Sequence, residues 1–146
     1  MCANKRGVTL MEVIITVVIV GIIAAIAIPA YTGYVNRTRR AEAVTALETV
    51  ALYEEKAFAE ANTYESLPDL IANRRLPDPN ANSRYYQIDV DPINGDYAEG
   101  FIATATPINE QAGDGIVFGI DSNGNRGTVS GGVVVQNQDL WNSLRR

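Results

Sequence analysis

The chain has 146 residues, 47% of them apolar, and a formal net charge of −5, which suits a folded domain of ordinary size and not a disordered chain. The acidic balance disfavours bulk binding of nucleic acid, whose phosphates repel such a chain. The chain has no histidine, one cysteine (Cys2), no phosphate-binding glycine loop and no nucleophile beside an evident base, so we expect no metal cage, no cofactor and no enzymatic activity.

An apolar helix near the N-terminus is the first predicted element. Lys5-Arg6 and Gly7 stand directly before the sequence Val-Thr-Leu-Met-Glu of residues 8–12, and residues 13–30 then carry no charge. Eighteen helical residues span roughly 27 Å, close to the thickness of the bilayer core. Cys2 precedes this apolar run instead of ending it, which disfavours a lipoprotein signal. We therefore predict one membrane anchor, followed by a domain of ordinary soluble composition.

Glu12 places a carboxylate at the start of the apolar run. A charge costs roughly 2.5–3.5 kcal/mol at a membrane centre, and such a group usually has a partner. Past Arg6 the chain itself offers no nearby cation, so we expect the partner of Glu12 to come from another molecule. The alternative is that Glu12 only reaches the lipid headgroups.

Residues 5–29 resemble the class III signal of type IV prepilins, in which a basic leader ends in Gly and is followed by Thr-Leu, a Glu and a long uncharged run. The resemblance implies a leader of residues 1–7, cleavage between Gly7 and Val8 by a prepilin peptidase, and N-methylation of Val8. It also implies that Glu12 pairs with the free amine of a neighbouring subunit during assembly. Val8 departs from the family pattern, in which the first mature residue is usually Phe.

One helix is predicted over residues 9–61. Gly21 and Pro29 weaken its apolar half, and Pro29 cannot donate to the carbonyl of Ala25, which predicts a kink or a local opening. In the family that it resembles, the stretch between Gly21 and Pro29 extends when subunits enter the filament. The second half carries an apolar stripe, predicted to pack on a sheet, at Val44, Leu47, Ala51, Phe58 and Ala61.

Three arginines, Arg37, Arg39 and Arg40, follow the apolar run. Their position suits contact with lipid headgroups or with acidic groups of neighbouring subunits in a fibre. A solvated helix face is the alternative, and the sequence does not separate these readings.

A short helix over residues 67–73, capped by Ser66, and an antiparallel sheet are predicted after the long helix. Asn94-Gly95 and residues 122–125 are turn signals between apolar segments. Strands are predicted at residues 85–90, 98–106, 115–120 and, as a fourth, around Val129 and 133–135. The predicted fold class is α+β, in which a long N-terminal helix packs on a small antiparallel sheet, as in the pilin fold. The predicted divisions are residues 1–7, 8–35 (anchor and polymerisation segment) and 36–146 (globular domain).

The chain after the anchor resembles PilE-type pilins at residues 31–46, 103–107 and 111–114 and at Leu140-Trp141. Many of these pilins close a disulfide loop near the C-terminus. This chain has no cysteine there, so an adhesive role is not transferred from that loop.

Two further sites are weaker candidates. Asp121, Asn123 and Asn125 place oxygens at alternate positions, as in the opening of a calcium loop, but the twelfth position is Gly132 and a plain hairpin turn is favoured. The second candidate group consists of Arg74, Arg75 and Arg84 with the neighbouring Tyr85 and Tyr86. Their positive charges and aromatic rings could contact the phosphates and bases of single-stranded DNA, but a solvated loop is favoured there.

Together these features predict a structural subunit of a type IV pilus, or fimbria, which is held in the bacterial inner membrane as a precursor and is then part of an extracellular filament. The implied partners are copies of the chain itself, other pilins, the prepilin peptidase and the pilus assembly platform, and the implied roles include adhesion and twitching motility. The alternatives are a type II secretion pseudopilin, a minor pilin that binds DNA or surfaces, and an anchored domain that never polymerises.

Overall fold

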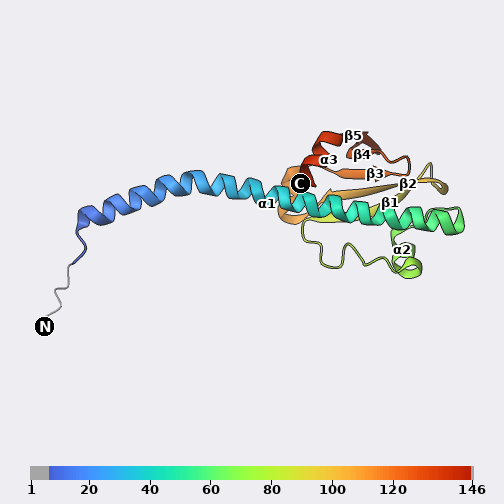
Figure 1. The fold of residues 1–146 in the computed structure, drawn as a ribbon, viewed down its shortest axis with the longest axis horizontal. Coiled ribbons are helices and arrows are strands. Elements are labelled where there is room, and N and C mark those ends of the chain that lie inside the picture. The colour runs from blue at the N-terminus through green and yellow to red at the C-terminus, as the bar shows by residue number, and fades with distance from the viewer. Residues whose placement is uncertain (1–6, 146) are drawn as a thin grey trace. The chain divides into compact units, whose positions relative to one another are not determined.

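The computed structural model describes residues 7–145, so Lys5, Arg6 and the rest of the predicted leader before Gly7 lie outside the described residues. The chain divides into two units, one ending at Asn36 and the other beginning at Arg37. Helix α1 (Leu10–Ala61) belongs to both (Figure 1). Its predicted extent, residues 9–61, is confirmed to within one residue.

The first half of α1 is apolar and uncovered. Its large apolar side chains are between 48% (Ile15) and 78% (Leu10) exposed over the stretch from Val8 to Tyr34. Among the described residues α1 is the one helix long and apolar enough to cross a membrane, with a mean hydropathy of 2.9 in its most apolar window. An apolar surface of this extent requires lipid or other protein to cover it.

The second half of α1 buries a stripe at Ala43, Val44, Leu47, Val50, Glu54 and Ala57. The predicted stripe is therefore only partly right: Ala51 and Phe58 are half-buried and Ala61 is exposed. The error arose because the prediction followed apolar residues alone. From Val44 onward the buried positions are three or four residues apart, as one helix face requires, and this spacing includes the charged Glu54.

Helix α2 (Leu67–Arg74) begins where predicted, because the Ser66 hydroxyl accepts a hydrogen bond from the backbone N–H of Asp69 (3.4 Å). Pro68 lies in its first turn, where a missing N–H costs nothing. The helix ends at Arg74, and the C-cap residue Arg75 has a left-handed φ of 58°.

Five antiparallel strands form one sheet in the order β1-β2-β3-β4-β5. Asn94 and Gly95, with φ of 53° and 83°, make the predicted turn between β1 and β2. The bounds are β1 (Tyr86–Ile93), β2 (Asp96–Pro107), β3 (Phe118–Asp121), β4 (Arg126–Ser130) and β5 (Val133–Gln136).

The sequence predictions were wrong in three places after β2. The third strand begins at Phe118, because a 3₁₀ helix, η1 (Asn109–Asp114), and left-handed Gly115 occupy the preceding residues. The predicted fourth strand is two strands, since Gly131-Gly132 adopts positive φ and reverses the chain between β4 and β5. The terminal helix α3 (Gln138–Leu144) was not predicted.

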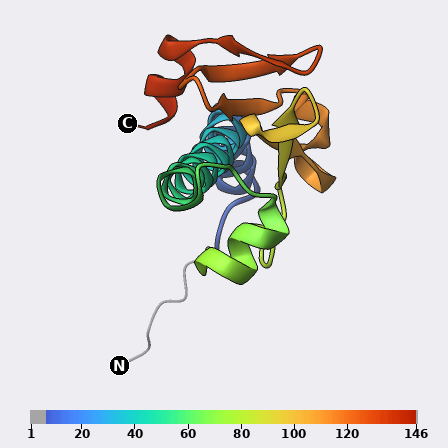
Figure 2. The same cartoon turned by 90° about the vertical axis from the view of Figure 1, so that its right-hand side faces the viewer.

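The core of the second unit lies between α1 and the sheet. Figure 2 looks nearly along α1 and shows strands above and beside the helix, with α2 below. The largest fully buried side chains include Leu47 of α1, Phe101 of β2, Phe118 of β3 and Trp141 of α3. Trp141 also donates its indole N–H to Glu48 of α1 (3.0 Å), which satisfies the buried donor. The α+β fold class is thus confirmed.

Candidate functional site

The start of α1 gives Glu12 a defined position. The backbone N–H of Glu12 lies 3.2 Å from the Thr9 hydroxyl oxygen and 3.1 Å from the Thr9 carbonyl oxygen. Thr9 therefore caps the helix, and Glu12 is its third residue, the Thr-x-x-Glu spacing of a capping box. A carboxylate in the first turn also complements the positive end of the helix dipole. Glu12 thus has a favourable local environment in addition to any intermolecular partner.

Gly7 and Val8 lie before the first turn of α1, outside regular secondary structure. Val8 is 70% exposed, and nothing lies within 4 Å of the place where a Cβ on Gly7 would stand. A protease binds its substrate as an extended segment, and this stretch is open to such binding. The cleavage and the methylation of Val8 remain predictions.

Gly21 and Pro29 lie within an unbroken helix. Apart from the neighbouring residues and backbone of α1 itself, no atom lies within 4 Å of a Cβ built on Gly21, and the Thr32 hydroxyl donates to the Pro29 carbonyl (2.9 Å). The helical assignment continues through Pro29, so the local opening considered from the sequence is not seen in this structure. The extension of this stretch on assembly remains a prediction.

Arg39 and Arg40 pair within the chain, which corrects the expectation that they face lipid, neighbouring subunits or water. Arg39 lies 3.1 Å from Glu110 of η1 and stacks over the Tyr85 ring, 3.9 Å from its centroid. Arg40 makes two bonds with the Asp114 carboxylate, one of them 2.8 Å long. Both arginines therefore tie α1 to η1, although about 70 residues separate the partners in sequence.

Asp114 is the centre of this network. It accepts hydrogen bonds from the Tyr86 hydroxyl (3.0 Å) and from the Gln111 amide (3.1 Å) as well as from Arg40. These donors, Arg40 first, hold the pKa of Asp114 below its usual value. Burial, followed by the bond to Asp114, raises the pKa of Tyr86 to about 12. The network therefore stays charged and intact at neutral pH. Arg37, the third arginine, donates to the Ser143 carbonyl (2.5 Å).

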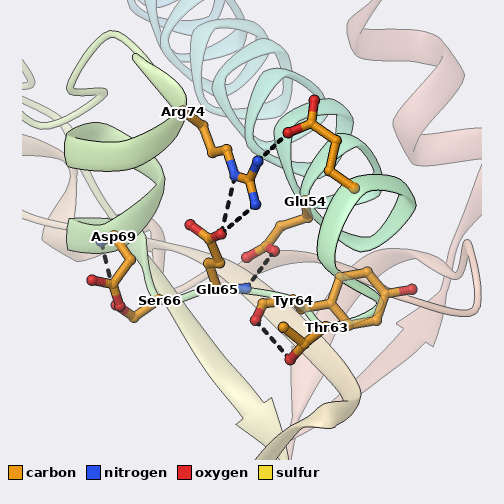
Figure 3. A network of polar contacts seen from close by, with 8 residues as sticks. Glu54, Thr63, Tyr64, Glu65, Ser66, Asp69 and Arg74 are labelled. Atoms are coloured by element: carbon orange, nitrogen blue, oxygen red, sulfur yellow. Dashed lines mark hydrogen bonds and ion pairs between the residues drawn. The ribbon is translucent and has the colours of Figure 1, made fainter.

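The three arginines considered for nucleic acid do not form one basic patch. Figure 3 shows Arg74 between α2 and the end of α1. Its guanidinium bonds Glu65 (2.7 and 3.0 Å) and also pairs with Glu60, so two carboxylates neutralise it. Arg75 and Arg84 are exposed, Arg75 at the C-cap of α2 and Arg84 just before β1.

Arg84 lines a groove of about 300 Å³ between α1 and the segment that leads into β1. Arg39, Tyr85 and Tyr86 line it as well, together with Glu42. Arg39 is already paired with Glu110, so Arg84 is the exposed cation that this groove offers to an anionic ligand. Of the residues that the sequence predicted for a DNA site, Arg84, Tyr85 and Tyr86 therefore lie together in this groove, and Arg74 and Arg75 do not line it.

The candidate calcium loop is a hairpin turn whose aspartate is already engaged. Asp121 is buried and accepts from the backbone N–H groups of Asn123 (2.9 Å) and Asn125 (3.0 Å) and from the Asn125 side chain (2.8 Å). These bonds favour the turn over a metal loop. Within residues 7–145, no group of three or more carboxylate or thiol side chains is placed to hold a metal ion.

The buried titratable residue that the sequence analysis missed is Glu54, a fully buried carboxylate of α1. The signal was available, because Glu54 falls at helical spacing with Leu47 and Val50 on the core face. The predicted stripe contained only apolar residues and therefore left Glu54 out.

Comparison with known proteins gives two family matches. Residues 29–115, more than half of the chain, match the family described as "Type IV minor pilin ComP, DNA uptake sequence receptor". Residues 2–28 match the "Prokaryotic N-terminal methylation motif".

Two curated relatives are similar over shorter stretches. The chain is 38% identical over 68 residues to the type IV major pilin protein PilA of Myxococcus xanthus, which covers 47% of this chain and 31% of the relative. It is 51% identical over 41 residues to the type IV major fimbrial protein FimA of Dichelobacter nodosus, covering 28% of this chain and 26% of the relative. The chain thus spans less than a third of the length of these relatives.

Proposed function

Because the chain belongs to the family of the type IV minor pilin ComP, within the type IV pilins, we propose that it is a structural subunit of a type IV pilus filament. The observation that carries the proposal is the uncovered apolar half of α1, which directly follows the methylation motif. In a precursor the bilayer covers this surface. In a filament the apolar halves of α1 from neighbouring subunits cover it. The proposed path is therefore from the inner membrane to an extracellular fibre.

Cleavage after Gly7 would place a new amine only two residues before the first residue of α1. The helix N-terminus already carries roughly half a positive charge, so an ammonium group there is disfavoured in its own subunit. The Glu12 carboxylate of a neighbouring subunit offsets that charge. In a low-dielectric fibre core the attraction is strong, but two charges are desolvated, so the pair contributes more to subunit register than to net stability.

The direct test is the recovery of the chain from a sheared filament fraction and the sequencing of its N-terminus. We expect the filament-borne protein to begin at Val8 with a methylated amine. A chain that begins at Met1 and remains in the membrane fraction would overturn the proposal. A type II secretion pseudopilin is the alternative within the same fold, and it predicts recovery from secretion filaments instead of surface pili.

DNA binding is the second candidate function, since the matched family is described as a DNA uptake sequence receptor and the groove beside Arg84 suits stacking and phosphate contact. Arg84→Ala should weaken binding of the full chain to DNA at low salt. It should also reduce the slope of log affinity against log salt by about 0.7–0.9 for each lost phosphate contact. Fluorescence anisotropy in non-ionic detergent measures both quantities.

Arg145→Ala is the matched control, because it removes the same charge from an exposed side chain on the C-terminal side of α3, paired with Glu48. Its affinity should stay close to that of the original chain. Equal effects of the two substitutions would indicate net charge alone, and an affinity without salt dependence would exclude this function.

A further inference from the structure

Glu54 stands on the core face of α1 and is fully buried, with 0% exposure. One carboxylate oxygen, Oε2, accepts the backbone N–H of Glu65 (3.0 Å). The other, Oε1, is buried with no hydrogen-bond partner. A buried, unpaired ionised carboxylate is far more costly than the neutral, protonated form, which leaves only one polar group unsatisfied.

The charges around Glu54 do not offset an ionised form. Figure 3 shows its carboxylate beside that of Glu65, whose own Oε2 is also buried without a partner. Arg74 is the nearby cation, and its charge is already shared by Glu65 and Glu60. Among the described residues, the other titratable groups near Glu54 are either acidic or uncharged at neutral pH. They are Glu55 of α1, Tyr64 and Glu65 of the following connection, and Tyr97 of β2.

The bond from Glu65 to Glu54 fastens the connection between α1 and α2. In that connection the Tyr64 ring stacks on Phe58 (4.7 Å between centroids) and packs against Phe101 (4.9 Å). The Tyr64 backbone N–H donates to the Tyr97 carbonyl (3.2 Å). The same few residues therefore join α1 to the sheet and lead into α2, and the buried carboxyl group bonds the backbone of this connection.

We propose that Glu54 is a pH-sensitive latch, which holds the connection between α1 and α2 closed while it carries a proton and loosens that connection when the proton is lost. The ionised form leaves a second negative charge beside Glu65 in a site that is closed to solvent. The closed form of the connection then competes with an open form in which water solvates the Glu54 carboxylate. The device is independent of whether the chain polymerises.

The direction of the pH dependence follows from the pKa. Burial raises the pKa of Glu54 from 4.5 to about 7, the Glu65 N–H acts in the opposite direction, and the charges of Glu65 and Glu55 raise it further. In the open connection the carboxyl group returns to its ordinary value. The closed form thus binds the proton more tightly, so its stability is full below about pH 4.5 and is lost as the pH rises through about 7.

Hydrogen exchange of the Tyr64 and Glu65 backbone amides, in the full chain in non-ionic detergent, measures the opening. After correction for the intrinsic pH dependence of exchange, the opening constant should rise roughly 70-fold between pH 5 and pH 8. Amides in the centre of β2, such as that of Ala103, should show a much smaller change. A flat opening constant at the two latch amides would overturn the proposal.

Glu54→Gln replaces the carboxyl group by a neutral amide of the same shape and should abolish the pH dependence. Glu42→Gln is the control, because Glu42 is an exposed carboxylate of the same helix that does not act on Glu54, and it should preserve the pH dependence. If the Glu54 variant fails to fold, carbon-13 NMR of the Glu54 carboxyl group in the unaltered chain decides. Titration near neutral pH supports the latch, and titration below pH 5 rejects it.

Discussion

Gly7→Ala should leave the chain in the membrane as the uncleaved precursor. Gly7 is the residue before the predicted scissile bond, in the open stretch that precedes α1. A peptidase that accepts only glycine at this position has no room for a Cβ. A displacement of the scissile bond by about 1 Å is enough to slow such a step about 100-fold. Gel mobility and N-terminal sequencing of the membrane fraction measure the processing.

Gly21→Ala is the matched control for that experiment. It adds the same methyl group within the helix, where nothing lies within 4 Å of the new Cβ, and it should raise helix propensity by about 1 kcal/mol without affecting cleavage. Normal processing of Gly7→Ala would contradict the assignment of the cleavage site. A defect in both variants would indicate general disturbance of the precursor.

Glu12→Ala should be cleaved normally and yet enter filaments poorly. The cut lies four residues from Glu12, outside α1, whereas the proposed partner of the carboxylate exists only between subunits. Removal of one partner from a desolvated pair costs about 3–5 kcal/mol, because the amine is left uncompensated. That cost corresponds to more than about 100-fold in the equilibrium for subunit addition. The amount of the chain in sheared filaments, relative to that in the membrane, measures it.

Glu12→Gln separates assembly from helix capping. The capping-box geometry at Thr9 tolerates an amide in place of a carboxylate. If Glu12 acts through its charge, the Gln variant should fail to assemble as the Ala variant does. Full filament yield from the Gln variant would assign the role to the cap, and full yield from Glu12→Ala would remove Glu12 from assembly.

The anchor and the long helix were predictable because their signals are local. Eighteen uncharged residues and the absence of Gly and Pro from 35 to 67 define α1 without reference to any other part of the chain. The same holds for Ser66 before α2 and for Asn94-Gly95 between β1 and β2. Short strands and α3 were harder, because five to seven residues carry too little periodicity to define an element.

The amino-acid sequence by itself determined the class III signal, the extent of α1 and the α+β class, since each depends on neighbouring residues. The tertiary structure alone decided the partners of the charged groups. Arg40 reaches Asp114, and Arg74 is neutralised by Glu60 and Glu65. Such ion pairs join segments that are distant in the sequence, and the packing of the helices against the sheet determines which charges meet. A local pattern of charged residues therefore does not predict them.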